Sequence, residues 1–182
     1  MTSKTSPGPE LPWDQAVVDI PKSGVAATRS ASADELERVA ASLDLAACRA
    51  LDADYRIEPL SGGRFQLTGH LRAEITQTCV VTLDPLESTI EEDFAAVFWP
   101  EADLPAPESG ELALDEEPER EAIAGGQIGV GRIVFETLAA AIEPFPRKPD
   151  AVLDWQPPGP AQSSRSEADS PFSVLANLKT KT

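Results

Sequence analysis

Apolar and polar side chains alternate in several runs between residues 51 and 98 of this chain. Neighbouring side chains of a β-strand point to opposite faces, so each run predicts a strand with one buried and one exposed face. The first two runs carry Leu51, Ala53, Tyr55 and Ile57, and then Phe65, Leu67, Gly69 and Leu71. Gly62 and Gly63 lie between these runs, and the pair predicts a β-hairpin.

Two more alternating runs follow the hairpin. One carries Ile75, Gln77, Cys79, Val81 and Leu83 and stops at Asp84-Pro85. The next carries Ile90, Glu92, Phe94, Ala96 and Phe98 and stops at Pro100. Consecutive strands joined by short loops are antiparallel, because parallel neighbours need a long crossover connection. We therefore predict an antiparallel meander of at least four strands.

Two other segments have the helical rather than the strand period. Ser32 and Glu35 form a capping box, after which Leu36, Val39, Ala40 and Leu43 recur on one face. These features predict a helix over about 33–44. A second helix is predicted over about 131–142, where Val134, Leu138, Ala141 and Ile142 share a face before Pro144. The fold class is therefore α+β, with two helices flanking the meander.

The composition divides the chain into one domain and several polar segments. Residues 1–12 are rich in proline and serine and are expected to be a disordered lead-in. A single α+β domain is expected over 13–155, interrupted at 101–121 by a mobile loop with nine acids and three prolines. We expect a linker at 156–170 and a short amphipathic motif at 171–182.

The charge of the chain is strongly acidic and unevenly distributed. There are 15 basic and 31 acidic side chains, which gives a net charge of −16, and residues 73–121 contain 15 acids and one base. Phosphate binding depends on lysine and arginine, so any RNA contact must come from a local basic patch. No stretch approaches the roughly 18 apolar residues of a membrane helix, and the first residues lack a signal-like apolar segment. We expect a cytoplasmic protein.

The sequence offers few residues for catalysis or metal binding. Its only histidine is His70, which the alternation places on the polar side of its strand, whereas Cys79 shares the parity of the apolar residues. A Cys–His pair is therefore not expected. Cys48 and Cys79 are far apart and form no CxxC pair, which argues against a disulfide framework and a zinc module. We predict no catalytic residue, no metal and no cofactor.

Two further features have ordinary structural interpretations. Gly129 and Gly131 in GGQIGVGRIVFETL precede the second helix, but no Gly-Lys-Ser/Thr follows and the third glycine of a dinucleotide fingerprint is missing. We interpret this stretch as a loop ahead of a packed helix. Glu136 lies within the apolar second helix, where a solvent-facing position explains it. No carboxylate pair among the 31 acids is marked out for acid–base chemistry.

Three stretches of the sequence together resemble one protein family. They are QTCVVTLDPLESTIEEDFAAVF, GRIVFETLAAAIEPFPRKPDAVL and PFSVLANLK, in this order and spacing. The family is YceD, the large ribosomal RNA subunit accumulation proteins, and the likeness is to its alphaproteobacterial branch, over about residues 15–180. The resemblance implies a cytoplasmic, non-enzymatic factor for the accumulation of large-subunit (23S) ribosomal RNA, through its processing or through subunit assembly. Family members often have an aspartate where this chain has Gly129, and many carry a second cysteine where Cys79 here stands alone.

Two spots in the sequence are candidates for binding RNA or a protein partner. Arg147 and Lys148 follow the second helix in a proline-rich turn. Ser170 and Pro171 form a favourable helix start, after which Phe172, Leu175 and Leu178 share one face beside Lys179. We expect a large-subunit ribosomal RNA precursor, a basic ribosomal protein or both as partners, and neither a membrane nor a small-molecule substrate. The alternatives are a chaperone-like binder of a basic ribosomal protein without RNA contact, and a small carboxylate-based hydrolase.

Overall fold

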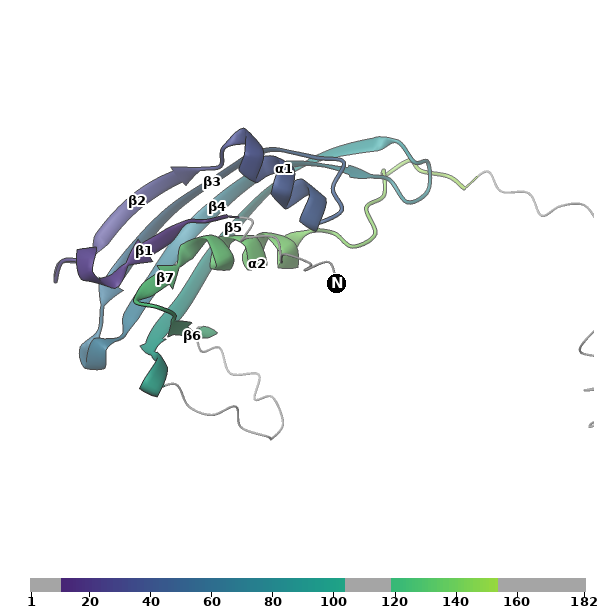
Figure 1. Cartoon of the computed structure of the whole chain (residues 1–182). Helices are drawn as coiled ribbons and strands as arrows, with labels where there is room; N and C mark the ends of the chain where they lie inside the picture. Colours follow the sequence, from purple (N-terminus) through teal and green to yellow (C-terminus); the bar gives the residue numbers. More distant parts are fainter. Residues whose placement is uncertain (1–10, 104–118, 154–182) are drawn as a thin grey trace, which may run out of the picture. The chain divides into compact units, whose positions relative to one another are not determined.

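The alternating segments form a five-stranded sheet, and two helices and a small two-stranded sheet lie against one of its faces (Figure 1). The computed structural model describes residues 11–103 and 119–153. The chain divides at Ala151 into two units, and every helix and strand named below belongs to the first. In chain order the elements are β1 (Asp14–Ala16), β2 (Val25–Ser30), α1 (Ala33–Ser42), β3 (Ala47–Pro59), β4 (Phe65–Thr78), β5 (Pro85–Pro100), β6 (Glu119–Ile123), β7 (Gln127–Gly129) and α2 (Val130–Ala141).

The large sheet has the strand order β2-β3-β4-β5-β6. Its first four strands pair antiparallel, which confirms the predicted meander, and β6 joins β5 in the parallel direction. The predicted hairpin is also confirmed, because Gly62 and Gly63 connect β3 to β4 with φ angles of 75° and 68°. Glycine adopts these positive angles without the steric strain of a side chain.

The strand boundaries differ from the prediction in two places. The runs predicted as separate strands from Phe65 and from Ile75 form the single strand β4, and the fourth strand of the meander is β2, which the sequence pattern missed. The run through Cys79 and Leu83 is not a strand beyond Thr78. It forms a turn closed by a hydrogen bond from the Leu83 N–H to the Cys79 carbonyl, and Leu83 is 75% exposed. A turn whose residues alternate in polarity by chance has the same pattern as a strand.

The first helix begins at the predicted capping box. The Ser32 hydroxyl accepts from the Glu35 N–H, and the Ser32 N–H donates to the Glu35 carboxylate at 2.7 Å. The other carboxylate oxygen of Glu35 accepts from the Trp13 indole at 3.0 Å. Burial raises the pKa of Glu35. The hydrogen bonds from Ser32 and Trp13 together lower it by more, so the pKa lies below its ordinary value. The cap therefore also fixes the segment that precedes β1.

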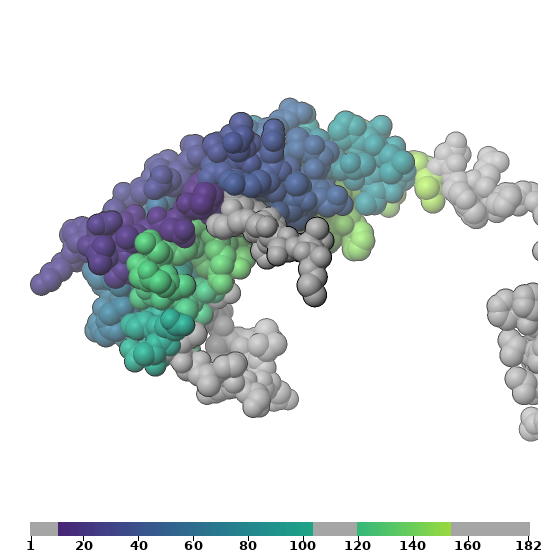
Figure 2. All heavy atoms as spheres, in the orientation of Figure 1, coloured from purple at the N-terminus to yellow at the C-terminus, as the bar shows by residue number. Residues whose placement is uncertain are grey.

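The hydrophobic core lies between the sheet and the elements that cover it. Figure 2 shows two of these elements, β1 in purple and α2 in green, packed side by side. The core-facing residues of β3 and β4 are largely buried, as are Phe94, Ala96 and Phe98 of β5 and one face of α2. The largest fully buried side chains are Leu51, Ile57, Leu67, Leu71, Ile75, Ile128, Leu138, Val39, Val130, Val134 and Cys79.

The first turn of α2 packs closely against the segment that precedes β1. Gly131 donates its N–H to the Trp13 carbonyl, and a Cβ atom at this position would collide with the carbonyl oxygen of Leu11. The loop predicted ahead of this helix is instead the strand β7, which ends at Gly129. Gly131 lies in the first turn of α2, where the missing side chain allows the close backbone approach. Glu136 on α2 is exposed as expected and lies 3.5 Å from Arg132.

The structure differs from the predicted segments at three of their ends. Leu11, in the expected lead-in, is only 3% exposed because it packs on α2. At the ends of the expected loop 101–121, residues 101–103 form a short 3-10 helix, and the last residues pair with β5 as part of β6. The acidic composition predicted no regular structure for these last residues, but backbone pairing with β5 orders them. The rest of that loop, the expected linker 156–170 and the motif 171–182 lie outside the described residues.

Candidate partner-binding surface

The turn Cys79–Asp84, which we call the Cys79 turn, is held against the segment that follows α2. The Val80 N–H donates to the Pro146 carbonyl at 2.9 Å, and the Gln77 side chain donates to the Glu143 carbonyl at 2.9 Å. Figure 1 shows this segment running along the end of the sheet where β4 turns into β5. Two of the three stretches that carry the family resemblance therefore meet in space.

Arg147 and Lys148 lie at this junction, but both are engaged within the chain. The Arg147 guanidinium donates to the Ala151 carbonyl at 2.8 Å, and Lys148 Nζ lies 3.0 Å from a carboxylate oxygen of Asp84. The hydrogen bond from Lys148 is the largest cause of a lowered pKa at Asp84. The pair thus stabilises the junction and is not a free basic patch. The other predicted binding residues, Phe172, Leu175, Leu178 and Lys179, lie outside the described residues.

Cys79 is fully buried at the centre of its turn. The Thr82 hydroxyl and the backbone N–H groups of Lys148, Thr82 and Val81 donate toward its sulfur, and these donors lower its pKa to about 6. His70 lies on the exposed face, where its Nδ1 is 2.9 Å from Asp93. The expected separation of Cys79 from His70 is therefore confirmed. In the described ranges, no group of three or more His, Cys, Asp or Glu side chains is arranged to hold a metal ion.

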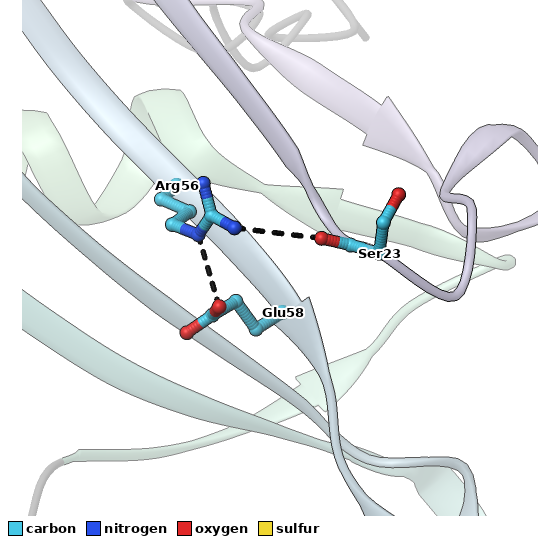
Figure 3. Close-up of polar contacts among 3 residues, drawn as sticks. All are labelled: Ser23, Arg56 and Glu58. Carbon is cyan, nitrogen blue, oxygen red and sulfur yellow. Dashed lines mark hydrogen bonds and ion pairs between the residues drawn. The ribbon is translucent and has the colours of Figure 1, made fainter.

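The face of the sheet opposite the core is covered with ion pairs. Arg56 donates to Glu58 at 2.9 Å and to the Ser23 carbonyl at 3.5 Å (Figure 3). Two further arginines, each 2.6 Å from a glutamate, form the pairs Arg49–Glu87 and Arg72–Glu91. Every arginine on β3, β4 and β5 thus has a carboxylate partner on this face.

Acids outnumber bases on these three strands. On this face they carry three arginines and six exposed acids, namely Asp54, Glu58, Glu74, Glu87, Glu91 and Asp93. A seventh exposed acid, Glu92, lies on the core side of β5. After the ion pairs have formed, the surface keeps an excess of negative charge. A surface of this sign attracts basic polypeptides and repels nucleic-acid phosphate.

The N-terminal part of β5 has a partner strand on one side only. Residues 86–95 pair with β4, whereas β6 pairs only with residues 96–100, and no other described strand joins β5. We call residues 86–95 the β5 edge. A cavity of about 230 Å³ lies beside it, lined on the β5 side by Leu86, Ser88 and Ile90, and on the other by Ala141, Pro146 and Arg147 among others.

Sequence reasoning missed the β5 edge. One signal was available, because Glu92 interrupts the apolar positions of its strand between Ile90 and Phe94. It lies opposite the fully buried Leu71, on the core side of the sheet, and is nevertheless exposed. A charge on the core side of a strand is a known protection of a sheet edge.

The fold and this surface define a small acidic α+β protein with a negatively charged exposed face. The family model for the large ribosomal RNA subunit accumulation protein YceD matches residues 67–179, more than half of the chain, and the chain belongs to this family. The match includes the Cys79 turn, the β5 edge and α2. Neither the curated proteins nor the solved structures gave a match. Within the described ranges, no helix is both long and apolar enough to cross a membrane.

Proposed function

We propose that this protein supports the accumulation of large-subunit ribosomal RNA as a non-enzymatic factor whose direct ligand is a basic ribosomal protein. Family membership supports the role in ribosomal RNA accumulation. The choice of a protein ligand rests on the surface, where β3, β4 and β5 expose seven acids against three paired arginines. Processing of the RNA and assembly of the subunit are both steps at which such a ligand would be needed.

Direct RNA contact is the weaker alternative because the two basic residues predicted to make it, Arg147 and Lys148, are engaged within the chain. Binding to phosphate releases counterions only where lysine and arginine are free to approach the backbone. Arg147 already donates to Ala151, and Lys148 is already paired with Asp84. Moving either residue to RNA would break an interaction that holds the junction together.

An acidic binder can promote RNA accumulation without touching RNA. Complementary charge raises the rate of encounter with a basic protein and shields that protein from non-specific association. Ribosomal RNA has a higher charge density than this surface, so it can take over the basic protein at its own site. The RNA is then covered by its protein, and the factor is released for another cycle.

Crosslinking in cells of the source organism tests the proposal. We expect the full chain, expressed at its native level, to co-sediment with large-subunit precursors and to crosslink to a basic ribosomal protein. RNA crosslinks at Arg147 or Lys148 would contradict the choice of ligand. Turnover in a screen of generic esters and phosphoesters by the purified chain would contradict the absence of enzymatic activity.

A further inference from the structure

We propose that the β5 edge binds an extended, lysine- or arginine-rich segment of the partner, which adds to the sheet as a further strand. The inference rests on the proposed function in taking the partner to be a basic protein. It goes further in naming the site and the conformation of the bound segment. In Figure 1, β5 forms the margin of the sheet over most of its length, and β6 joins it near one end only.

The backbone of the β5 edge supplies the hydrogen-bonding groups. In an antiparallel pair, alternate residues direct their N–H and C=O groups toward the partner strand, and the residues between them direct theirs away. Residues 86–95 have β4 on one side and no described strand on the other. The outward groups form a template for an extended peptide, as in domains that bind ligands by strand addition.

Charge determines which segment this edge accepts. Glu87 and Glu91 are paired with Arg49 and Arg72, but Glu92 forms no ion pair with any described residue. A second copy of the chain would bring these same acids against each other and be repelled. A segment that carries lysine or arginine at the matching positions would instead be attracted. The acids therefore protect the edge against self-association and select a basic ligand.

The cavity beside the β5 edge adds a preference for one apolar residue. Every second side chain of an added strand would point to the core side of the sheet, where Ile90 and Pro146 contribute apolar surface and the cavity has a volume of about 230 Å³. A cavity of this size accepts a side chain such as valine or leucine. The ligand is therefore a strand with basic residues at most positions and an apolar residue beside Ile90.

Amide exchange measured by NMR on the full chain tests the strand addition. The probe is a synthetic peptide that carries lysine at every position except one central valine. We expect it to slow the exchange of alternate amides between Leu86 and Ala95. Slowed exchange elsewhere with none at this edge would overturn the inference. Concentration-dependent dimerisation of the free chain, with the same amides protected, would identify a second copy as the occupant and would also overturn it.

Two matched comparisons separate strand addition from general charge attraction. Glu92→Lys should weaken peptide binding about fivefold, the scale of one exposed ion pair turned into a repulsion, whereas Glu37→Lys on α1 makes the same charge change away from the edge and should have little effect. Methylation of alternate peptide amides should weaken binding about tenfold or more, because it removes the backbone hydrogen bonds and keeps the charge. Equal binding of the methylated and unmethylated peptides would overturn strand addition.

The same variants distinguish this inference from the proposed function. If Glu92→Lys leaves the crosslinks to a basic ribosomal protein intact in cells, the edge is not the site, although the proposed function stands. If the wild-type chain gives no such crosslinks, the proposed function itself is wrong.

Discussion

Lys148 Nζ lies 3.0 Å from Asp84 Oδ2, although 64 residues separate the two side chains in the sequence. The contact joins the Cys79 turn to the segment after α2, and both belong to the part of the chain that the family model matches. Lys148, which the sequence predicted as an RNA contact, therefore makes a contact within the folded chain.

Lys148→Met should raise the pKa of Asp84 toward its ordinary value of 3.8, because the largest cause of the lowered pKa is the hydrogen bond from Lys148. A carboxyl with a lowered folded-state pKa stabilises the fold above pH 3.8 and loses that contribution as the pH falls through the lowered value. The free energy of unfolding of the variant should therefore depend less on pH in this acidic range than that of the wild type. NMR titration of Asp84 measures the shift, with Lys22→Met as the control. An unchanged Asp84 titration would show that the ion pair does not form in solution.

Gly131→Ala should destabilise the protein by about 1–3 kcal/mol, since the new methyl group would meet the Leu11 carbonyl in a packed site. Helix propensity alone predicts that the substitution stabilises the protein, because alanine is favoured over glycine within helices by roughly 0.5–1 kcal/mol. Urea unfolding measures the difference. Ala139→Gly, at an exposed position of the same helix, gives the ordinary propensity effect for comparison. A stabilised Gly131→Ala protein would disprove the close packing of Leu11.

Replacing Arg147 and Lys148 together by alanine should leave any RNA binding unchanged, because both side chains already have partners within the chain. Binding to a large-subunit RNA fragment at several salt concentrations checks this. If both residues contacted phosphates, the slope of the logarithm of the binding constant against the logarithm of the salt concentration would be shallower by about two in the double variant. The double variant Lys22→Ala with Arg29→Ala removes the same charge from other exposed positions and serves as the control.

Truncation after Pro160 should leave the melting temperature unchanged and abolish co-sedimentation with large-subunit precursors. The buried core residues of the described structure lie between Leu11 and Ala151, and the truncated chain keeps all of them. The motif from Phe172 to Lys179 is too short for a helix that persists alone in water, and a partner would supply its packing. A shorter deletion of residues 161–169 keeps the motif and is the control. A lower melting temperature would show that the motif packs on its own domain, and normal co-sedimentation would show that it is dispensable.

Much of the fold could be predicted from the sequence because it depends on residues close together in the chain. The capping box of Ser32 and Glu35 determines the start of α1. The two glycines after β3 give the backbone angles that the hairpin requires. The alternation along β3 and β5 assigns core residues such as Ile57 and Phe98 correctly, because the strand period is the same wherever the strand lies.

Only the tertiary structure decided the features that depend on which strands and segments become neighbours. The sequence of β2 is too irregular to predict a strand, and its place is set by backbone pairing with β3. The engagement of Lys148 depends on a partner 64 residues away. The β5 edge is open because no described strand pairs with residues 86–95 on that side, and the sequence of β5 alone cannot indicate its missing neighbour. Local periodicity determines which side chains are buried, whereas pairing between distant segments determines which backbone groups and charges remain available to a partner.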